Sequence, residues 1–386
     1  MRTTEVLIIG GGVIGASVAY HLATMGCTDV LVVDRGDAPG AGSTSKATGG
    51  FRCQFATEVN VRLSLLSRQK LLQFKEVTGV DPDYDPRGYL FLARHERELI
   101  ALREAQRVQH ACGVTGAVEV TPEDILRLNP AVSMDGIIGG VFCDLDGFIK
   151  PMNIQRGYME AAERLGVRFE FGVECTSFSR TSHGITEVQT STDAISAGAI
   201  VNAAGAWAGQ LGTLMGIRLP VVPLRRQIAP LRERGLLPAE MPMTIFVEDG
   251  FHCRVRDGRI LILLPTPQSS NDSFHIGVDP SWIERVHAVA KKRFDVLRDT
   301  SIDASECWAG LYEMSPDNHV ILGRATEVGN VFLANGSSGH GVMHSPALGE
   351  LLAEVMLTGY PSAFDINALR PSRFEEGKPN PASQFL

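Results

Sequence analysis

The amino-terminal residues alternate between short apolar runs and a segment of helical spacing, in the order of one βαβ unit. Residues 5–9 (EVLII) form a short, mostly apolar run of the kind found in strands buried on both faces. Residues 10–15 are rich in glycine, and residues 16–23 then place alanine and leucine at helical spacing. Residues 29–34 are a second apolar run. The pattern therefore predicts strand, glycine turn, helix and strand.

Two later segments repeat the pattern of a buried strand that ends in glycine-rich sequence. Residues 199–205 and residues 331–334 are apolar runs of this kind. The second run leads through residues 335–341 into a helix that we expect at residues 346–357. Three βα-like segments, near the start, the middle and the end of the chain, therefore share the character of a nucleotide-binding domain.

The remaining periodicity predicts a mixture of surface helices and strands. We expect helices at residues 60–78, 96–113, 153–165 and 283–297, with a further helix capped by Thr121, and strands at residues 89–92, 167–171, 244–247 and 259–264.

With 386 residues, the chain is too long for one ordinary domain. The predicted fold class is α/β with an α+β roof: a doubly wound nucleotide-binding domain beside a second, mostly antiparallel-sheet domain that covers the substrate. We assign residues 1–80, 147–220 and 319–375 to the first domain, residues 81–146 and 221–318 to the second, and residues 376–386 to a tail.

Composition and charge exclude several classes of protein. The chain is 44% apolar and 21% charged, as expected for a soluble globular protein. Its net charge of −8 argues against a nucleic acid or an anionic membrane as partner. The seven cysteines contain no CxxC pair, so we expect neither a disulfide framework nor a metal site. No signal peptide and no membrane-spanning apolar run is evident, which favours a cytoplasmic protein.

The first glycine-rich turn fits the dinucleotide-binding pattern G-x-G-x-x-G between a strand and a helix. Glycine permits the tight turn, the approach of a pyrophosphate to the backbone, and close packing of helix on strand. The helix amino terminus presents unpaired N–H groups to the phosphates. An acid ends the second strand, where it can accept from ribose hydroxyls. The residues expected to bind the dinucleotide here are Gly10, Gly12, Val13, Ile14, Gly15, Asp34 and Arg35.

Two further glycine-rich loops favour FAD over a nicotinamide cofactor. Residues 42–50 follow the second strand directly, and residues 335–341 end at a helix amino terminus. A large planar flavin needs such distributed backbone contacts, and the positive end of a helix would stabilise its reduced, anionic form. A nicotinamide-dependent dehydrogenase stays open as an alternative at this point.

Taken together, these motifs resemble the glycine/D-amino-acid oxidase (DAO) family of FAD-dependent oxidoreductases, and within it the β-subunits of sarcosine oxidase and of L-proline dehydrogenase. The resemblance covers nearly the whole chain. It rests on the segments 10–15, 42–55, 203–207, 308–317 and 336–341.

The resemblance implies that FAD lies extended across the doubly wound domain, with its ring under the antiparallel sheet. The residues that it adds to the cofactor site are Gly42, Ser43, Thr44, Lys46, Gly49, Gly50, Val173, Ala204, Gly205, Trp207, Gly310, Gly339, His340, Gly341, Val342 and Met343. Positions at which some members of the family attach flavin covalently carry Gly310, Lys46 and Pro151 here, so the resemblance implies non-covalent FAD.

The residues of the substrate pocket that the resemblance implies differ from those of the best-known family members. Arg52 corresponds to an arginine that holds the substrate carboxylate, and a planar guanidinium suits that task. In the family, a lysine activates oxygen, and its position corresponds loosely to the region of His275 in this chain. The absence of a lysine there argues against oxidase activity. We expect His252 and His275 to face the flavin from the roof, with His340 as a further candidate.

The resemblance implies that a hydride is removed from the carbon next to an amino acid's nitrogen and that the resulting imine is hydrolysed. The implied substrate is a secondary or N-substituted amino acid. Electrons would then leave to oxygen, a soluble acceptor or a partner subunit. The alternative in another class is a flavoprotein that keeps FAD but serves the assembly of a larger complex without catalysis.

Overall fold

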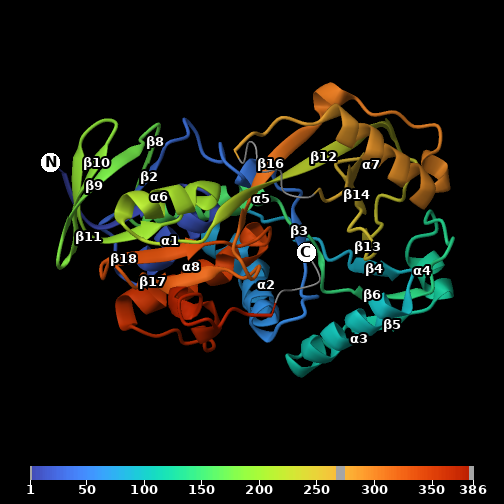
Figure 1. Cartoon of the computed structure of the whole chain (residues 1–386), viewed down its shortest axis with the longest axis horizontal. Coiled ribbons are helices and arrows are strands. Elements are labelled where there is room, and N and C mark those ends of the chain that lie inside the picture. Colours follow the sequence, from blue (N-terminus) through green and yellow to red (C-terminus); the bar gives the residue numbers. More distant parts are fainter. Residues whose placement is uncertain (1, 267–273, 382–386) are drawn as a thin grey trace.

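The computed structural model describes residues 2–266 and 274–381. Its secondary structure gathers into two large sheets that lie side by side, each with its own helices (Figure 1). The prediction of a mixed α/β fold with a doubly wound part and a second sheet is confirmed. The residue boundaries of two separate domains stay a prediction.

The first sheet is the nucleotide-binding sheet. Its main path has the strand order β17-β18-β11-β1-β2-β8, and the strands from β18 to β8 run parallel to their neighbours. The strands are β1 (Arg2–Ile9), β2 (Val30–Asp34), β8 (Arg168–Phe171), β11 (Ala194–Asn202), β17 (Ile321–Arg324) and β18 (Val331–Asn335). A hairpin of β9 (Cys175–Thr181) and β10 (Gly184–Thr190) pairs with β11 and was not predicted, because its strands are largely polar.

Helices cover both faces of this sheet, which explains the continuous apolar runs. On one face, α1 (Val13–Thr24) packs against α8 (Gly341–Thr358) and α5 (Pro151–Arg164), with α2 (Glu58–Thr78) outside them (Figure 1). The other face carries α6 (Ala208–Met215). Along β1, Val6 and Ile8 belong to the first core and Leu7 and Ile9 to the second, so every apolar residue of the run is buried.

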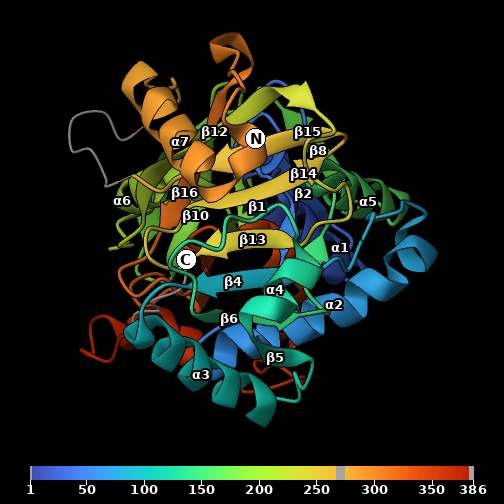
Figure 2. The same cartoon turned by 90° about the vertical axis from the view of Figure 1, so that its right-hand side faces the viewer.

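The second sheet forms the roof over the site, and Figure 2 looks onto it. Its order is β16-β12-β15-β14-β13-β4-β6-β5, antiparallel except between β13 and β4. The strands are β4 (Tyr89–Ala93), β5 (Ala117–Val120), β6 (Gly139–Cys143), β12 (Val222–Arg234), β13 (Met243–Phe246), β14 (His252–Arg256), β15 (Arg259–Leu263) and β16 (Trp308–Met314). Its helices are α3 (Glu96–Ala111), α4 (Pro122–Leu128) and α7 (Pro280–Arg293). A small ribbon of β3 (Gly50–Phe51) and β7 (Gly147–Phe148) joins the two parts.

The predicted start of the last helix is wrong, and the difference matters for the site. The helix α8 begins at Gly341 rather than near Pro346, which lies inside it. Proline has no N–H to donate to the carbonyl four residues earlier, that of Val342. The Ser345 hydroxyl donates to that carbonyl instead, at 2.9 Å. The helix therefore continues through the proline, and its first turn reaches the glycine-rich loop.

A second boundary also differs from the prediction. The strand β11 ends at Asn202, so residues 203–205 of the predicted run lie beyond it. Gly205 has a φ of 54° and begins a short 3-10 helix, Gly205–Trp207. This turn directs the following residues toward the space between the two sheets.

Candidate active site

A cavity of about 920 Å³ lies between the two sheets and is lined by residues of both. Its size falls at the upper end of the range for small-molecule and cofactor sites. The lining combines the turn after β1, the end of β2, the loop at residues 40–50, strand β16, the start of α8 and the roof strands.

The glycine turn after β1 is closed so tightly that side chains are excluded from it. Gly10 has a φ of 114°, and a Cβ atom there would lie 2.2 Å from the carbonyl oxygen of Ala203. A Cβ atom on Gly15 would lie 1.9 Å from the carbonyl oxygen of Gly10. The first contact holds the turn against the neighbouring strand, and the second lets α1 pack closely on β1, as the sequence pattern requires.

At the end of β2, Asp34 organises the backbone around the turn. One carboxylate oxygen accepts from the N–H of Gly11 and the other from the N–H of Gly36, both at 2.7 Å. The neighbouring Arg35 stacks on the ring of Trp207, with 4.1 Å from Cζ to the ring centroid. Val173 donates its N–H to the carbonyl of Asp34 at 2.9 Å. These residues form the end of the cavity where the sequence predicts the ribose and the adenine.

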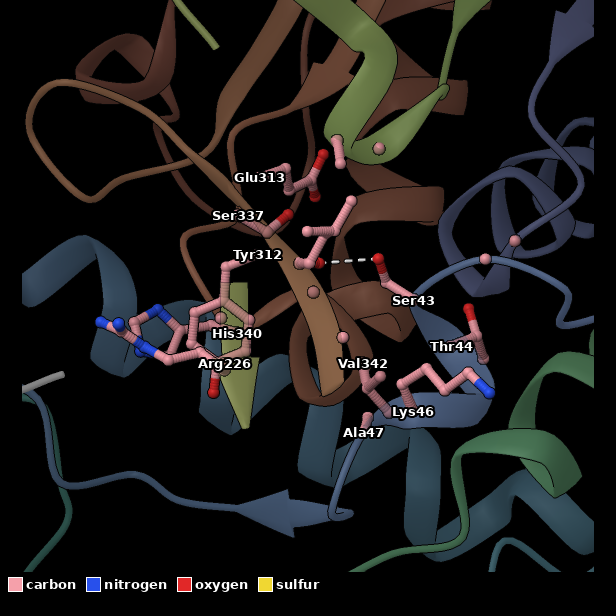
Figure 3. Close-up of a pocket in the computed structure, with 18 of the residues that line it drawn as sticks. Ser43, Thr44, Lys46, Ala47, Arg226, Tyr312, Glu313, Ser337, His340 and Val342 are labelled. Atoms are coloured by element: carbon pink, nitrogen blue, oxygen red, sulfur yellow. Dashed lines mark hydrogen bonds between the residues drawn. The ribbon is translucent and has the colours of Figure 1, made fainter. Parts of the chain in front are cut away.

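The loop at residues 42–50 is fixed by both parts of the protein. Thr44 accepts the N–H of Val13 at 3.2 Å, and the Ser43 hydroxyl donates to the carbonyl of Leu311 on β16 at 2.7 Å (Figure 3). The hydroxyl of Thr44 therefore occupies one of the N–H groups that the start of α1 leaves without an intrahelical partner.

Side chains from the roof hold three successive carbonyl groups of the same loop. Trp308 donates its Nε1–H to the carbonyl of Lys46 at 3.0 Å, and Arg256 donates to that of Ala47 at 3.3 Å. Arg254 donates to the carbonyl of Thr48 at 2.6 Å and lies over the ring of Phe148. The second sheet thus fixes the path of this loop.

The amino terminus of α8 opens onto the cavity. Gly341, Val342 and Met343 form its first turn and all line the cavity. The first N–H groups of a helix have no intrahelical acceptor and carry a partial positive charge. This turn therefore offers hydrogen-bond donors to an anionic or electron-rich edge of a ligand.

Arg52 lies at the roof end of the same cavity, where neighbouring residues hold its side chain. Its guanidinium is 2% exposed and lies 4.3 Å from the ring centroid of Phe55. One Nη donates to the carbonyl of Gln54 at 3.3 Å, and the other lies 3.2 Å from Nε2 of His340. A guanidinium can only donate, so this Nε2 is an acceptor and the proton of His340 is on Nδ1. Burial and the charge of Arg52 keep the pKa of His340 well below its usual value.

His252 also lines the cavity, from the start of β14. Its Nδ1 lies 2.9 Å from the carbonyl of Gly250, so Nδ1 carries the proton. Burial lowers the pKa of His252 to about 4, with smaller contributions from the charges of Arg226 and Arg52. The ring is neutral at physiological pH.

All of the predicted cofactor residues except Gly15 line the cavity. Gly15 packs against the carbonyl oxygen of Gly10 and so supports the turn. Among the catalytic candidates, Arg52, His252 and His340 line it as well. His275 is exposed and is not among the described residues that form the cavity wall, so the expectation that it faces the flavin is not supported. The binding and catalytic roles of all these residues stay predictions.

Several polar residues that the cavity brings together were not among the site residues predicted from the sequence. Arg226 and Tyr312 lie side by side on β12 and β16, and Glu313 and Ser337 line the opposite side of β16 (Figure 3). Strand alternation offers a weak signal, because Tyr312 and Glu313 must point to opposite faces. For Arg226 this signal is ambiguous, because Arg225 and Arg226 are adjacent and alternation alone does not tell which of the two arginines faces the cavity.

The features of this cavity fit FAD. The glycine turn excludes side chains where a pyrophosphate would approach, a second ordered loop follows β2, and the start of α8 offers donors at the far end. In comparison with known proteins, residues 5–355 match the family described as FAD dependent oxidoreductase, DAO. The chain belongs to this family. The resemblance found in the sequence is confirmed, FAD is the cofactor, and the nicotinamide alternative is overturned.

Relatives and solved structures agree with this assignment. The chain is 28% identical to FAD-dependent oxidoreductase domain-containing protein 1 of Xenopus laevis, covering 97% of this chain and 83% of that one. It is 29% identical to mitochondrial dimethylglycine dehydrogenase of Rattus norvegicus, covering 96% of this chain and 45% of the relative. The crystal structure of L-proline dehydrogenase from P. horikoshii matches with a TM-score of 0.91 at 26% identity, covering 98% of this chain and 100% of that chain. Across the part of the chain that the structure describes, no helix is both long and apolar enough to cross a membrane.

Proposed function

We propose that this DAO-family protein oxidises the bond between carbon and nitrogen of an amino acid, with a secondary or N-substituted amino acid as substrate. The observation that carries the proposal is Arg52, a buried guanidinium in the same cavity as the FAD-binding loops. Similar proteins that are named as dehydrogenases of dimethylglycine and of L-proline support it. An imine would form and would then hydrolyse in water.

When bound, FAD supplies the two-electron acceptor that takes a hydride from the carbon attached to nitrogen. Arg52 binds the substrate carboxylate, because a planar guanidinium pairs with both oxygens at once. His340 accepts a hydrogen bond from Arg52 and Phe55 packs under it, so the guanidinium is oriented before the substrate arrives. His340 is therefore a positioning residue, and its Nε2 is engaged rather than available as a base.

The substrate amine must be neutral to release a hydride easily. Burial in the cavity between the two sheets disfavours the charged ammonium form and lowers the pKa of a bound ammonium group. His252 is neutral and adds no charge. The cavity itself thus promotes loss of the ammonium proton, and no side-chain base is required for this step.

We propose that FAD is held without a covalent bond. Gly310, Lys46 and Pro151 stand at the positions where related proteins attach flavin, and none of these residue types forms such a bond. Electrons then pass to oxygen, to a soluble acceptor or to a partner subunit. His275, the residue nearest in sequence to an oxygen-activating lysine of the family, is exposed.

The proposal is tested by an anaerobic visible spectrum of the purified protein during titration with sarcosine, L-proline, glycine and D-amino acids. Loss of the flavin band near ~450 nm with one of them is the expected result. Readmission of air then separates an oxidase from a dehydrogenase. A flavin band that no amino acid bleaches would contradict the proposal and favour a flavoprotein that serves assembly.

A further inference from the structure

A second arginine, Arg226, lines the roof end of the cavity. It lies on β12, and its guanidinium is 5.6 Å from the ring centroid of Tyr312 on the neighbouring β16 (Figure 3). Nη1 donates to the carbonyl of Thr266 at 2.9 Å. Within residues 2–266 and 274–381, no carboxylate forms an ion pair with Arg226.

The neighbouring arginine on the same strand shows what an ordinary pairing looks like here. Arg225 donates to a carboxylate oxygen of Asp279 at 2.6 Å and to the carbonyl of Gly277, also at 2.6 Å. Side chains alternate along a strand, and Arg225 is not among the described residues that line the cavity, whereas Arg226 is. The two residues therefore have the same charge and backbone environment but different partners.

Arg226 and Arg52 face the same chamber. Tyr312 lies beside Arg226, and a Cβ atom on Gly339 would come within 2.4 Å of the Tyr312 ring. Gly339 precedes His340, whose Nε2 contacts the guanidinium of Arg52 at 3.2 Å. The pKa of His252 is lowered by charge on both arginines, which agrees with this arrangement.

Among the described residues, the acidic side chains in this part of the wall do not pair with Arg226. Glu248 and Asp249 line the cavity, but both accept hydrogen bonds from Arg293, at 2.8 and 3.1 Å. Asp34 is at the other end of the cavity, where it accepts backbone N–H groups. Arg226 is half-buried, and removing a cation from water is costly unless a counter-charge accompanies it. A ligand that supplies that charge would meet the requirement.

We propose that Arg226 binds a second anionic group of the substrate, so that the substrate class is an amino acid with an additional carboxylate. This inference rests on the proposed function, in which Arg52 binds the carboxylate next to the reacting carbon. Arg226 then sets specificity at the other end of the molecule, by the same bidentate recognition of a carboxylate.

The test compares pairs of compounds that differ by one carboxylate, using the FAD-loaded protein. Sarcosine is paired with iminodiacetate, and N-methylalanine with N-methylaspartate, each of the last two as both enantiomers. The dissociation constant and the limiting rate of flavin reduction are measured by anaerobic stopped flow. Acetate and malonate, which cannot be oxidised at a carbon–nitrogen bond, are titrated separately through the change that they cause in the flavin spectrum.

We expect the wild-type protein to bind the dicarboxylate of each pair more tightly, on the order of 100-fold. Arg226→Gln should weaken the binding of the dicarboxylate of each pair and so remove this advantage, and Arg226→Lys should restore part of it. The control Arg225→Gln, which removes the same charge from the other face of the strand, should keep the preference.

Two results would overturn the proposal. Equal binding of mono- and dicarboxylates by the wild-type protein would show that no second anion site exists. An equal loss for both members of a pair in Arg226→Gln would show that Arg226 shares the single carboxylate with Arg52. If no amino acid reduces the flavin while malonate still binds more tightly than acetate through Arg226, the anion site stands and the proposed amine oxidation fails.

Discussion

Glu313 is an acidic side chain buried at the cavity, and no cation among residues 2–266 and 274–381 pairs with it. It lies on β16, is 9% exposed and lines the cavity beside Ser337 (Figure 3). Its Oε2 atom has no hydrogen-bond partner among the described residues. Burial raises the pKa of the Glu313 carboxyl to about 7. We therefore predict that the flavin-free protein keeps Glu313 protonated over a range in which the unfolded chain is ionised.

The size and sign of the effect follow from proton linkage. Between about pH 4.5, the ordinary pKa of the side chain, and about pH 7, the folded protein binds more protons than the unfolded chain. Stability contributed by this group is therefore present at low pH and is lost as pH rises through this range. At about 1.4 kcal/mol for each tenfold change, the raised pKa costs the folded protein roughly 3 kcal/mol above pH 7.

The substitution Glu313→Gln measures this cost, because glutamine has a similar size and cannot ionise. The free energy of unfolding of the flavin-free variant, minus that of the flavin-free wild type, should rise by roughly 3 kcal/mol between about pH 5 and pH 8. Urea unfolding at several pH values gives this difference. Infrared spectra at pH 6 give a direct check. A carboxylic-acid band in the wild type that is missing from the variant would show that Glu313 is protonated.

A difference between variant and wild type that stays constant from pH 5 to pH 8 would refute the reasoning. It would mean that Glu313 ionises in the folded protein as it does in water. A difference that falls with rising pH would be more serious, since it requires a cation near the carboxylate that the described residues do not supply.

Three further outcomes follow from contacts in the structure. Gly15→Val should yield protein without flavin, because even a Cβ atom at this position would lie 1.9 Å from a backbone oxygen of the glycine turn. The control Gly329→Ala should retain flavin, because a Cβ atom there would have no other atom within 4 Å. The flavin absorbance per protein checks both variants. Arg52→Lys should raise the dissociation constant of a reducing amino acid about 100-fold in anaerobic titration, and an unchanged constant would place the carboxylate elsewhere. Arg373→Met should destabilise the protein to urea by about 3–5 kcal/mol, because it leaves the carboxylate of Asp317, 1% exposed, without its cation, and a loss below 1 kcal/mol would contradict this.

The parts of the site that the sequence predicted are those that backbone geometry controls. A glycine that must touch a neighbouring carbonyl, such as Gly10 or Gly15, is identified by its place between a buried strand and a helix. The loop at residues 42–50 is recognised in the same way, by small residues directly after a buried strand. These requirements are local, so a single sequence contains them.

The roof of the site was less predictable, because its residues meet only through tertiary structure. Arg225 and Arg226 are adjacent and identical in type, yet one pairs with Asp279 and the other lines the cavity. His252 and His275 were equal candidates, and only the first lines the cavity. Which face of a strand meets the flavin domain depends on the docking of the two sheets, and periodicity within one strand does not contain that information.

The charges in the roof connect substrate recognition with reactivity. A substrate with two carboxylates would neutralise Arg52 and Arg226, whereas a substrate with one carboxylate would leave the half-buried Arg226 without a carboxylate partner among the described residues. With both arginines neutralised, an ammonium group would be the remaining positive charge, and Glu248 and Asp249, acids of the described wall in this part of the cavity, already accept from Arg293. Burial therefore favours the neutral amine. Because the neutral amine is the form that releases a hydride, the pairing of both carboxylates with the two arginines places the amine in a buried site that favours its reactive protonation state.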